Sequence, residues 1–295
     1  MNEDYSDSII VTGCDENHFA LAEDLAQSIH ERKSRAYALG FVNMSSLGQK
    51  FAAADMFDFC VEAPGARLAE LVNIKGFKIA YLNVKALLPD LFPGYRRYLW
   101  LDADCWVQNE IGLMQILELC QDQDLAIHPE YDIHYTSQKT PSNRNMMVYR
   151  QIFGGTEDED KRDNMRFPMV NAGVFGATAR SPLWKSWTGL MDEIRERPDP
   201  ERTKFYCDQV PLHYLISSGQ LSCFPLRSIN NWQTYACAPM FDIRRKRLVL
   251  PTPPHEEINI MHLAAHSKDC KYKFGEMGLT SLRYRHFKKF VANAV

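Results

Sequence analysis

The sequence predicts a single-domain α/β protein with a mainly parallel sheet that helices cover on both faces. Short apolar segments of strand length alternate along the chain with segments of helical periodicity, which is the pattern of repeated βα units. The segment YLWL at 98–101 is apolar at every position, as expected of a strand buried on both faces. With 295 residues, the chain is long enough to bury such a sheet.

Each predicted element follows from a local pattern. SIIVTG, at 8–13, is an apolar run that ends in polar residues, and it predicts the first strand. A helix is expected next, because apolar residues recur there at the spacing of one helical face. That face consists of Phe19, Leu21, Leu25 and Ile29. Segments 36–44 and 57–63 then predict strands, and 79–92 predicts a helix that ends near two prolines.

Composition and charge restrict the function. The net charge of -3 and the pI near 6.3 give no reason to expect a nucleic-acid partner. Eight cysteines lie far apart without a C-x-x-C pair, which argues against a zinc ribbon or a disulfide framework. No segment has the length of an apolar membrane span, and the first residues lack the pattern of a signal peptide. We therefore expect a reducing, cytoplasmic location.

Two carboxylates stand where the apolar strand ends. Asp102 and Asp104 are separated only by Ala103, and on an extended chain they would point to the same side. Mg²⁺ and Mn²⁺ are typically held by one or two carboxylates together with phosphate oxygens of a substrate. The simpler interpretation is a pair of solvated turn residues, because an isolated D-x-D occurs often by chance.

A second group of candidate ligands lies in INIMHLAAHSKD, at 258–269. Alternating apolar residues predict a strand that ends at His262, whose imidazole could complete a metal site begun by two carboxylates. Lys268 follows, and its charge suits a phosphate. Taken alone, His262 is more often a buried core histidine. A helical zinc pair with His266 is a rival interpretation, but it lacks the glutamate of an H-E-x-x-H motif.

Taken in order, these motifs resemble glycosyltransferase family 8, whose members have the GT-A fold and transfer a sugar from a nucleotide, usually uridine-linked, with retention. The resemblance covers about residues 9 to 270. It rests on DEN at 15–17, LWLDADCWV, VNAGVFG, CDQVPL and HLAAHSK. The chain departs from the family pattern where His18-Phe19 replace a tyrosine that stacks on the base, and where Ala265 replaces a glycine.

The resemblance implies a role for each motif. A metal ion, Mn²⁺ or Mg²⁺, would be held by Asp102, Asp104 and His262. Catalysis would involve Asp208, Gln209 and Lys268. The donor would contact Thr12, Asp15, Asn17, Lys85, Ala103, Asn171 and Gly173. Whether Asp208 or Gln209 is a nucleophile, a stabiliser of an oxocarbenium-like state or a sugar clamp stays open, and Asp208 could simply begin a helix.

The expected function is transfer of a hexose from a nucleotide sugar, with a UDP-hexose as the expected donor, to a saccharide or glycolipid acceptor. Two alternative functions share some of these features. A haloacid dehalogenase-type phosphatase also ends a strand in D-x-D, but normally at the first strand and with a later G-D-x-x-x-D segment that is missing here. A sugar-nucleotide binding protein without transferase activity is favoured only by Ala265, whose methyl group would keep the backbone further from a phosphate.

Two further segments carry separate expectations. The polar region 131–166 predicts a mobile loop or lid within a catalytic domain that spans residues 1–278. The tail, 279–295, is basic and amphipathic. Its simpler interpretation is a final helix that packs on the domain. The predicted packing residues are Leu279, Leu282, His286 and Phe290. The alternative is a helix on the inner membrane surface, which would bring the enzyme to a lipid-linked acceptor.

Overall fold

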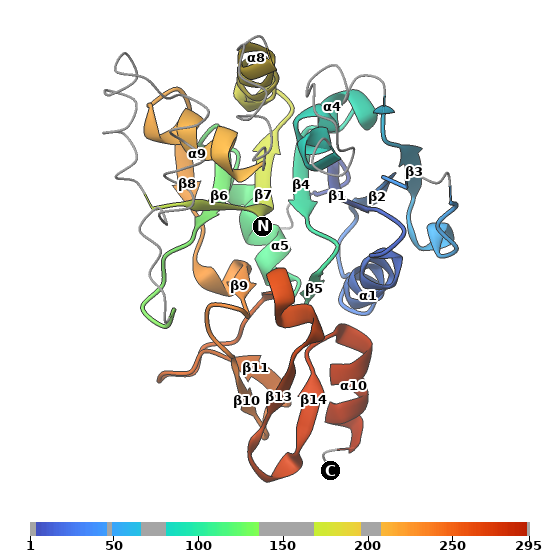
Figure 1. Ribbon diagram of the computed structural model, residues 1–295, viewed down its shortest axis with the longest axis vertical. Coiled ribbons are helices and arrows are strands. Elements are labelled where there is room, and N and C mark those ends of the chain that lie inside the picture. The colour runs from blue at the N-terminus through green and yellow to red at the C-terminus, as the bar shows by residue number, and fades with distance from the viewer. Residues whose placement is uncertain (1–3, 46–48, 66–80, 136–167, 196–207, 294–295) are drawn as a thin grey trace.

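A computed structural model of the protein describes residues 4–45, 49–65, 81–135, 168–195 and 208–293 (Figure 1). Its centre is a seven-stranded sheet. From edge to edge the strands are β3 (Phe59–Glu62), β2 (Ala38–Asn43), β1 (Ser8–Cys14), β4 (Arg97–Leu101), β7 (Val170–Thr178), β6 (Leu125–Pro129) and β8 (Cys223–Pro225). The strands predicted at 8–13, 36–44, 57–63 and 98–101 are therefore confirmed.

The sheet is mainly parallel, as predicted. β3, β2, β1 and β4 form one parallel block, and β6 and β8 form a second. β7 joins the two blocks because it runs antiparallel to both β4 and β6. Its amino-terminal half therefore lies beside the carboxyl end of β4, and this brings segment 170–173 next to the D-A-D motif.

Helices cover both faces of the sheet, which gives three layers (Figure 1). Successive side chains of a strand point to opposite faces, so Ile9 and Val11 of β1 join one apolar core and Ile10 joins the other. The first core is completed by η2 (Tyr81–Leu87), α4 (Leu88–Leu91), α8 (Leu183–Arg195) and α9 (Gln209–Ser217). The second is completed by α1 (Phe19–His30) and α5 (Ile111–Leu119).

Where the structure describes the helix predicted at 79–92, most of it is a 3₁₀ helix and not an α-helix. From residue 81 the chain forms the 3₁₀ helix η2 and then only one turn of α-helix, α4, with Pro89 at the start of that turn. Proline lacks the amide hydrogen and restricts the residue before it, so one continuous α-helix cannot run through this position. The prediction that this helical region ends between Pro89 and Pro93 is confirmed, because α4 ends at Leu91.

Shorter elements form a C-terminal lobe below the main sheet in Figure 1. A three-stranded sheet joins β5 (Cys105–Val107), β12 (Ile260–His262) and β9 (Trp232–Gln233). Two hairpins follow, β10 (Met240–Asp242) with β11 (Arg247–Val249), and β13 (Lys271–Lys273) with β14 (Leu279–Ser281). The remaining elements are η1 (Ala54–Met56), η6 (Ser228–Asn230), η7 (Ala265–Asp269), η8 (Gly275–Met277) and α10 (Tyr284–Asn293).

The C-terminal tail packs on the protein, and the predicted face is confirmed for Leu282 and Phe290 but not for Leu279 and His286. Leu282 and Phe287 are buried, together with Tyr284, in the apolar core of the C-terminal lobe, and Phe290 packs against it. Leu279 and His286, which were predicted to be buried, are exposed. Leu279 belongs to β14 and not to α10, so the helical spacing used for the prediction does not apply to it. Most of the predicted loop at 131–166 lies outside the described residues.

Two general expectations can be compared with the described residues. The cysteines among them are all free, as expected of a chain without a disulfide framework. None of the helices in these ranges is both long and apolar enough to cross a bilayer.

Candidate active site at the strand ends

The D-A-D motif is a tight turn between β4 and β5. The amide of Cys105 donates to the carbonyl of Asp102 over 2.9 Å, so the prediction that Asp102 and Asp104 share one side of an extended chain is wrong. The turn makes their two carboxylates diverge toward different partners. Both nevertheless emerge at the carboxyl end of a central strand, where ligands bind in open α/β sheets.

Asp102 belongs to a buried group of charges around Lys85. Lys85 Nζ lies 2.7 Å from Asp102 Oδ1, contacts Asp208 Oδ2, and donates to the carbonyl of Ala172 over 3.0 Å. Burial opposes the charged ammonium, but the two carboxylates outweigh burial and raise the pKa of Lys85. The indole of Trp100 also donates to Asp102 Oδ1, over 2.7 Å. Asp102 Oδ1 is therefore engaged, and Oδ2 is the atom available for a metal ion.

Asp104 belongs to a second group of charges. The antiparallel register of β12 and β5 sets His262 opposite Cys105, next to Asp104. His262 Nε2 lies 3.3 Å and Lys268 Nζ lies 3.5 Å from the Asp104 carboxylate. Burial opposes ionisation of Asp104, but His262 and Lys268 outweigh it and keep the carboxyl pKa below its usual range. Burial likewise opposes protonation of His262, whose pKa Asp104 raises above the ordinary value.

Gly173 brings the two groups of charges together. A β-carbon added to Gly173 would lie 2.3 Å from His262 Cε1 and 3.0 Å from Asp102 Oδ2. The backbone of β7 therefore passes directly between these two side chains, and the amide of Asp102 donates to the Gly173 carbonyl over 2.7 Å. Only glycine leaves room for this approach. Glycine at the third position of the N-A-G motif is thus required on steric grounds.

The residues present fit a divalent cation. Asp104, Cys105 and His262 offer ligand atoms within 4.8 Å of one another. Cys105, however, lies in the apolar core, and burial together with the nearby Asp104 raises its thiol pKa, so the thiol resists ionisation. Oxygen ligands also suit Mg²⁺ and Mn²⁺ better than sulfur. Asp102 is not part of this group, so its carboxylate lies further from at least one of the other ligand atoms. We propose it as the third ligand, through Oδ2.

A chain of buried amides and a carboxylate leads from His262 to α9. His262 Nδ1 lies 2.8 Å from Asn231 Oδ1, and the Asn231 amide donates to Asn171 Oδ1 over 3.0 Å. The Asn171 amide in turn donates to Glu130 Oε1 over 3.1 Å. Gln209 Nε2 donates to the same carboxylate oxygen over 3.3 Å and to the Val170 carbonyl over 2.9 Å. Two predicted site residues, Asn171 and Gln209, are thereby held in fixed orientations.

Sequence reasoning missed Glu130 and Asn231. Glu130 directly follows β6 and is buried, and Asn231 follows η6 and is also buried. The segments that contain them, LAIHPE and SINNW, have no recognisable motif. A polar residue directly after an apolar strand was the available signal, the same one that drew attention to Asp102.

Asp208 precedes α9, as the simpler interpretation predicted. Its carboxylate makes no capping bond to the helix and instead contacts Lys85 Nζ. Its side chain is therefore directed into the charged group and not toward the first amides of the helix.

Four predicted donor contacts lie along β1 and the D-A-D turn. Thr12 is buried in β1, and its hydroxyl has no hydrogen-bond partner among the described residues. Asp15 and Asn17 form the turn after β1, where Asp15 Oδ1 accepts from the Asn17 amide over 3.2 Å and lies 2.7 Å from His18 Nδ1. Ala103 packs in the apolar cluster of Cys14 and Phe41, which places the D-A-D turn beside the end of β1.

The segment after His262 has an unusual backbone. The strand predicted to end at His262 is confirmed as β12, and the rival helical zinc pair is wrong because His266 lies beyond the strand and is exposed. Ala265 has φ of 55°, in the left-handed region that favours glycine. The alanine thus keeps the conformation expected of the glycine that it replaces.

Solved structures show the same arrangement of elements. The galactosyltransferase LgtC, in complex with donor and acceptor sugar analogs, is 15% identical and has a TM-score of 0.55, with 97% of this chain and 95% of that chain covered. The chain has the GT-A glycosyltransferase fold. Mouse xyloside xylosyltransferase 1 is 12% identical with a TM-score of 0.53, over 88% of this chain and 97% of that one.

The bifunctional glycosyltransferase WbbM has a TM-score of 0.56 at 13% identity; the match covers 99% of this chain but 50% of that protein. No protein-family model and no curated protein matches the chain. The GT-A fold therefore rests on structure, and it confirms the fold that the sequence motifs implied.

Proposed function

We propose that the protein is a metal-dependent glycosyltransferase that moves a hexose from a nucleotide sugar, with UDP-hexose as the expected donor, to a saccharide or lipid-linked acceptor with retention. One observation carries the proposal. Two groups of charges, Lys85–Asp102–Asp208 and Asp104–His262–Lys268, meet at Gly173 on the strand-end face of a GT-A fold.

The chemistry follows from the leaving group. A nucleoside diphosphate leaves readily only when its developing negative charge is neutralised, and Mn²⁺ or Mg²⁺ would supply Lewis-acid stabilisation when bound. Asp102, Asp104 and His262 would hold the ion. Lys268 is partly exposed at the edge of this group, so its ammonium can approach a phosphate that lies beside Asp104.

The sugar would be oriented by the amide network. Gln209 uses Nε2 for Glu130 and the backbone of Val170, which leaves its carbonyl oxygen as the atom available to a sugar. Asp208 is held beside Lys85, but burial, together with the charge of Asp102, outweighs the ammonium and raises the pKa of the Asp208 carboxyl above its ordinary value. These contacts support a role for both residues beside the anomeric carbon, as nucleophile, charge stabiliser or clamp.

A donor-binding protein without transferase activity is the second candidate. Ala265 was the feature that favoured it, because a methyl group replaces a hydrogen where the family carries glycine. Since Ala265 already has the backbone conformation of that glycine, the substitution leaves the course of the chain unchanged. We therefore prefer the transferase.

The test is metal-dependent binding and hydrolysis of uridine, guanosine and cytidine diphosphate sugars. Mn²⁺ should support activity at least as well as Mg²⁺, because imidazole suits the later transition metals. Asp104→Ala should lower the rate about 100- to 1000-fold and abolish metal-dependent donor binding, whereas Asp122→Ala, at an exposed position, should behave as wild type. Unchanged nucleotide affinity in Asp104→Ala, with and without chelator, would rule out the metal site.

A further inference from the structure

The two hairpins of the C-terminal lobe form an exposed surface that the proposed active site does not use. We call residues 240–249 and 271–281 the hairpin tip. Phe241 and Phe274, one from each hairpin, pack against each other with ring centroids 5.9 Å apart. Both also pack against Phe287 of α10. The inner side of the hairpin tip is therefore an aromatic core, and this core fixes the two hairpins side by side.

The outer side of the hairpin tip is apolar and exposed. Met240 flanks Phe241 in β10. Together with Ile243 and Met277, it lines a shallow groove of about 650 Å³ between the hairpins. Phe241 and Phe274 reach this side as well, because both line the groove between the hairpins. Leu279 pairs with Lys273, which also lines the groove, and paired residues share one face of a hairpin.

Exposed apolar residues are concentrated at the hairpin tip and are not spread evenly over the described surface. Eight large apolar side chains are exposed in the described part of the chain, and three of them, Met240, Ile243 and Leu279, belong to the hairpin tip. Their exposed fractions are 43%, 56% and 64%. Single exposed apolar residues are common on soluble proteins, whereas a group around one groove indicates a contact surface.

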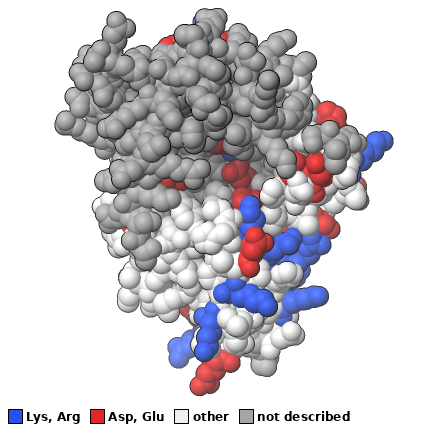
Figure 2. Space-filling model, in the orientation of Figure 1, with Lys and Arg blue, Asp and Glu red and all other residues white. Residues whose placement is uncertain are grey.

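The charge around these residues is positive. The hairpin tip contains six Lys and Arg against two Asp and Glu, a formal charge of +4 in a chain whose net charge is -3. Arg245 pairs with Asp242 and Arg247 pairs with Glu257. The other four basic side chains form no ion pair among the described residues, although the charge of Arg244 still helps to lower the pKa of Asp242; they are Arg244, Lys246, Lys271 and Lys273. Figure 2 shows Lys and Arg gathered over the lower half of the visible face, where the C-terminal lobe lies.

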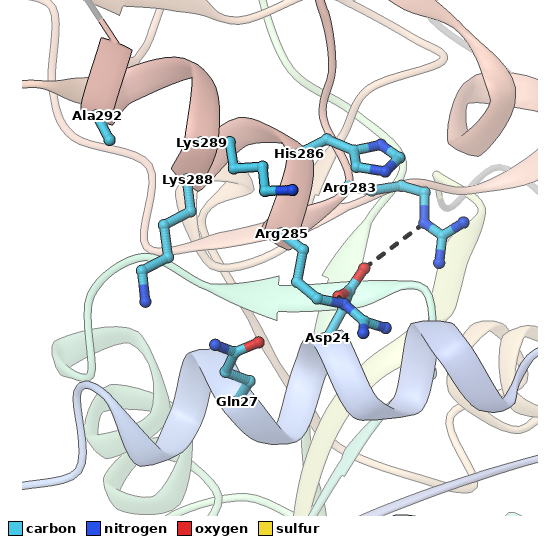
Figure 3. A pocket seen from close by; sticks show the side chains of 8 residues that line it. All are labelled: Asp24, Gln27, Arg283, Arg285, His286, Lys288, Lys289 and Ala292. Carbon is cyan, nitrogen blue, oxygen red and sulfur yellow. Dashed lines mark hydrogen bonds and ion pairs between the residues drawn. The ribbon is translucent and has the colours of Figure 1, made fainter.

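Several basic residues in α10 and just before it, by contrast, do have carboxylate partners. Figure 3 shows Arg283, Arg285 and Lys288 on the side of α10 that faces α1. Arg285 contacts the buried carboxylate of Asp24, which also lies 3.5 Å from Arg283. Lys288 Nζ lies 2.6 Å from Glu31. Much of the positive charge of the tail is thus neutralised within the protein.

We propose that the hairpin tip, and not α10, is a membrane-surface contact that places Met240, Ile243 and Leu279 among the headgroups of an anionic bilayer. Exposed apolar side chains surrounded by unpaired cations match the interface of such a bilayer, with an apolar boundary beneath negative headgroups. In Figure 1 the hairpins lie at the end of the lobe furthest from the main sheet, so a membrane can reach them without covering that sheet. The proposal does not depend on the transferase reaction.

The test is co-sedimentation of the full chain with vesicles of phosphatidylcholine alone and of phosphatidylcholine mixed with phosphatidylglycerol, at low and high salt. Binding should require the anionic lipid and weaken with salt. Arg244→Gln with Lys246→Gly should lower the partition constant about 25-fold, at about fivefold for each cation. Lys246 has φ of 56°, which glycine adopts without strain, so this variant should stay folded.

Two further variants separate the alternatives. Ile243→Ser should weaken binding and leave its salt dependence unchanged, because it removes apolar contact but no charge. Lys288→Gln with Lys289→Gln on α10 should change the partition constant less than twofold. Failure to bind anionic vesicles at low salt, or a larger loss from the α10 variant than from the hairpin-tip variant, overturns the proposal. So does concentration-dependent dimerisation that Ile243→Ser abolishes without any vesicle binding, since the occupant would then be a second copy of the chain.

Discussion

Ala265 adopts a left-handed backbone conformation that its side chain disfavours. A non-glycine residue in this region is typically less stable by about 1 kcal/mol or more, and glycine removes that cost. Glycine also adds freedom to the unfolded chain, so we expect Ala265→Gly to raise the free energy of unfolding by about 0.5–1 kcal/mol, measured by urea denaturation.

The neighbouring Ala264 provides the matched control. Its φ is -59° and its ψ is 152°, a conformation that alanine adopts without strain. Ala264→Gly should therefore lower stability by about 0.5–1 kcal/mol, because glycine gains freedom only in the unfolded chain. Equal effects of the two substitutions, in sign and size, would mean that the left-handed conformation of Ala265 carries no strain.

Glu130 is the residue at which the amide network converges. Its Oε1 accepts from Asn171, Gln209 and the hydroxyl of Tyr235, the last over 3.3 Å. Under the proposed function, Glu130→Ala should leave Asn171 and Gln209 misoriented and lower kcat by about tenfold to 100-fold, with a smaller change in KM for the donor.

The control for this prediction is Tyr235→Phe, which removes one bond to Glu130 but leaves those from Asn171 and Gln209. It should retain most activity. If Glu130→Ala turns over at the wild-type rate, the network is structural support only and does not position the sugar.

At the scale of elements, the packing of α10 on α1 depends on a buried carboxylate. The side chain of Asp24 is 4% exposed and contacts Arg285, whose side chain is 41% exposed. Arg285→Ala removes this partner and leaves only Arg283, at 3.5 Å. We expect a loss of about 1–2 kcal/mol in unfolding free energy, because an under-paired buried carboxylate is costly.

Lys288→Ala is the comparison, since its pair with Glu31 lies at the surface. Surface ion pairs contribute little and are screened by salt, so the loss should stay below about 0.5 kcal/mol. Thermal and urea unfolding of both variants measure the difference. A loss from Lys288→Ala as large as that from Arg285→Ala would argue against the importance of Asp24.

The strands were predictable because an apolar run is a local property. β1, β2, β3 and β4 each follow from such a run, as does the exit of β12 at His262. The turn at D-A-D was not predictable, because its geometry depends on β5 pairing with β12, about 155 residues away along the chain. The buried face of the tail was mispredicted for a similar reason, since Leu279 pairs in β14.

At the scale of the molecule, the sequence motifs identified candidate site residues, but only the fold shows which of them form ion pairs with one another. Asp102, Asp104, His262, Asp208 and Lys85 were all candidates, but nothing local pairs Lys85 with Asp208 and Asp102, or His262 with Asp104. His262 reaches Asp104 because β12 pairs with β5. Lys85 and Asp208 reach Asp102 because η2 and α9 pack on the same face of the sheet. Glu130 and Asn231 could not be predicted, because their hydrogen bonds to other site residues form only in the folded protein.

The response of the whole protein to acid should depend in part on two buried histidines, His213 and His128, whereas the raised pKa of His262 acts in the opposite direction. His213, in α9, is buried, and burial lowers its pKa to about 4. An unfolded histidine takes up a proton near pH 6.5. Between about pH 6.5 and about 4 the unfolded state therefore binds more protons than the folded state, and stability decreases as the pH falls through that range. His128, buried at the end of β6 with a pKa lowered to about 4, acts in the same direction.

His213→Gln tests this dependence because glutamine does not titrate. Near pH 5 one such histidine contributes a slope of about 1.2 kcal/mol per pH unit to the unfolding free energy. We expect urea denaturation at several pH values from 7.5 to about 4.5 to show a slope smaller by about that amount in the variant. At pH 7.5 the two proteins should differ only by a constant packing term, because His213 is neutral in both states there. Parallel curves for the two proteins across the acid range would show that His213 titrates in the folded state as it does in the unfolded chain.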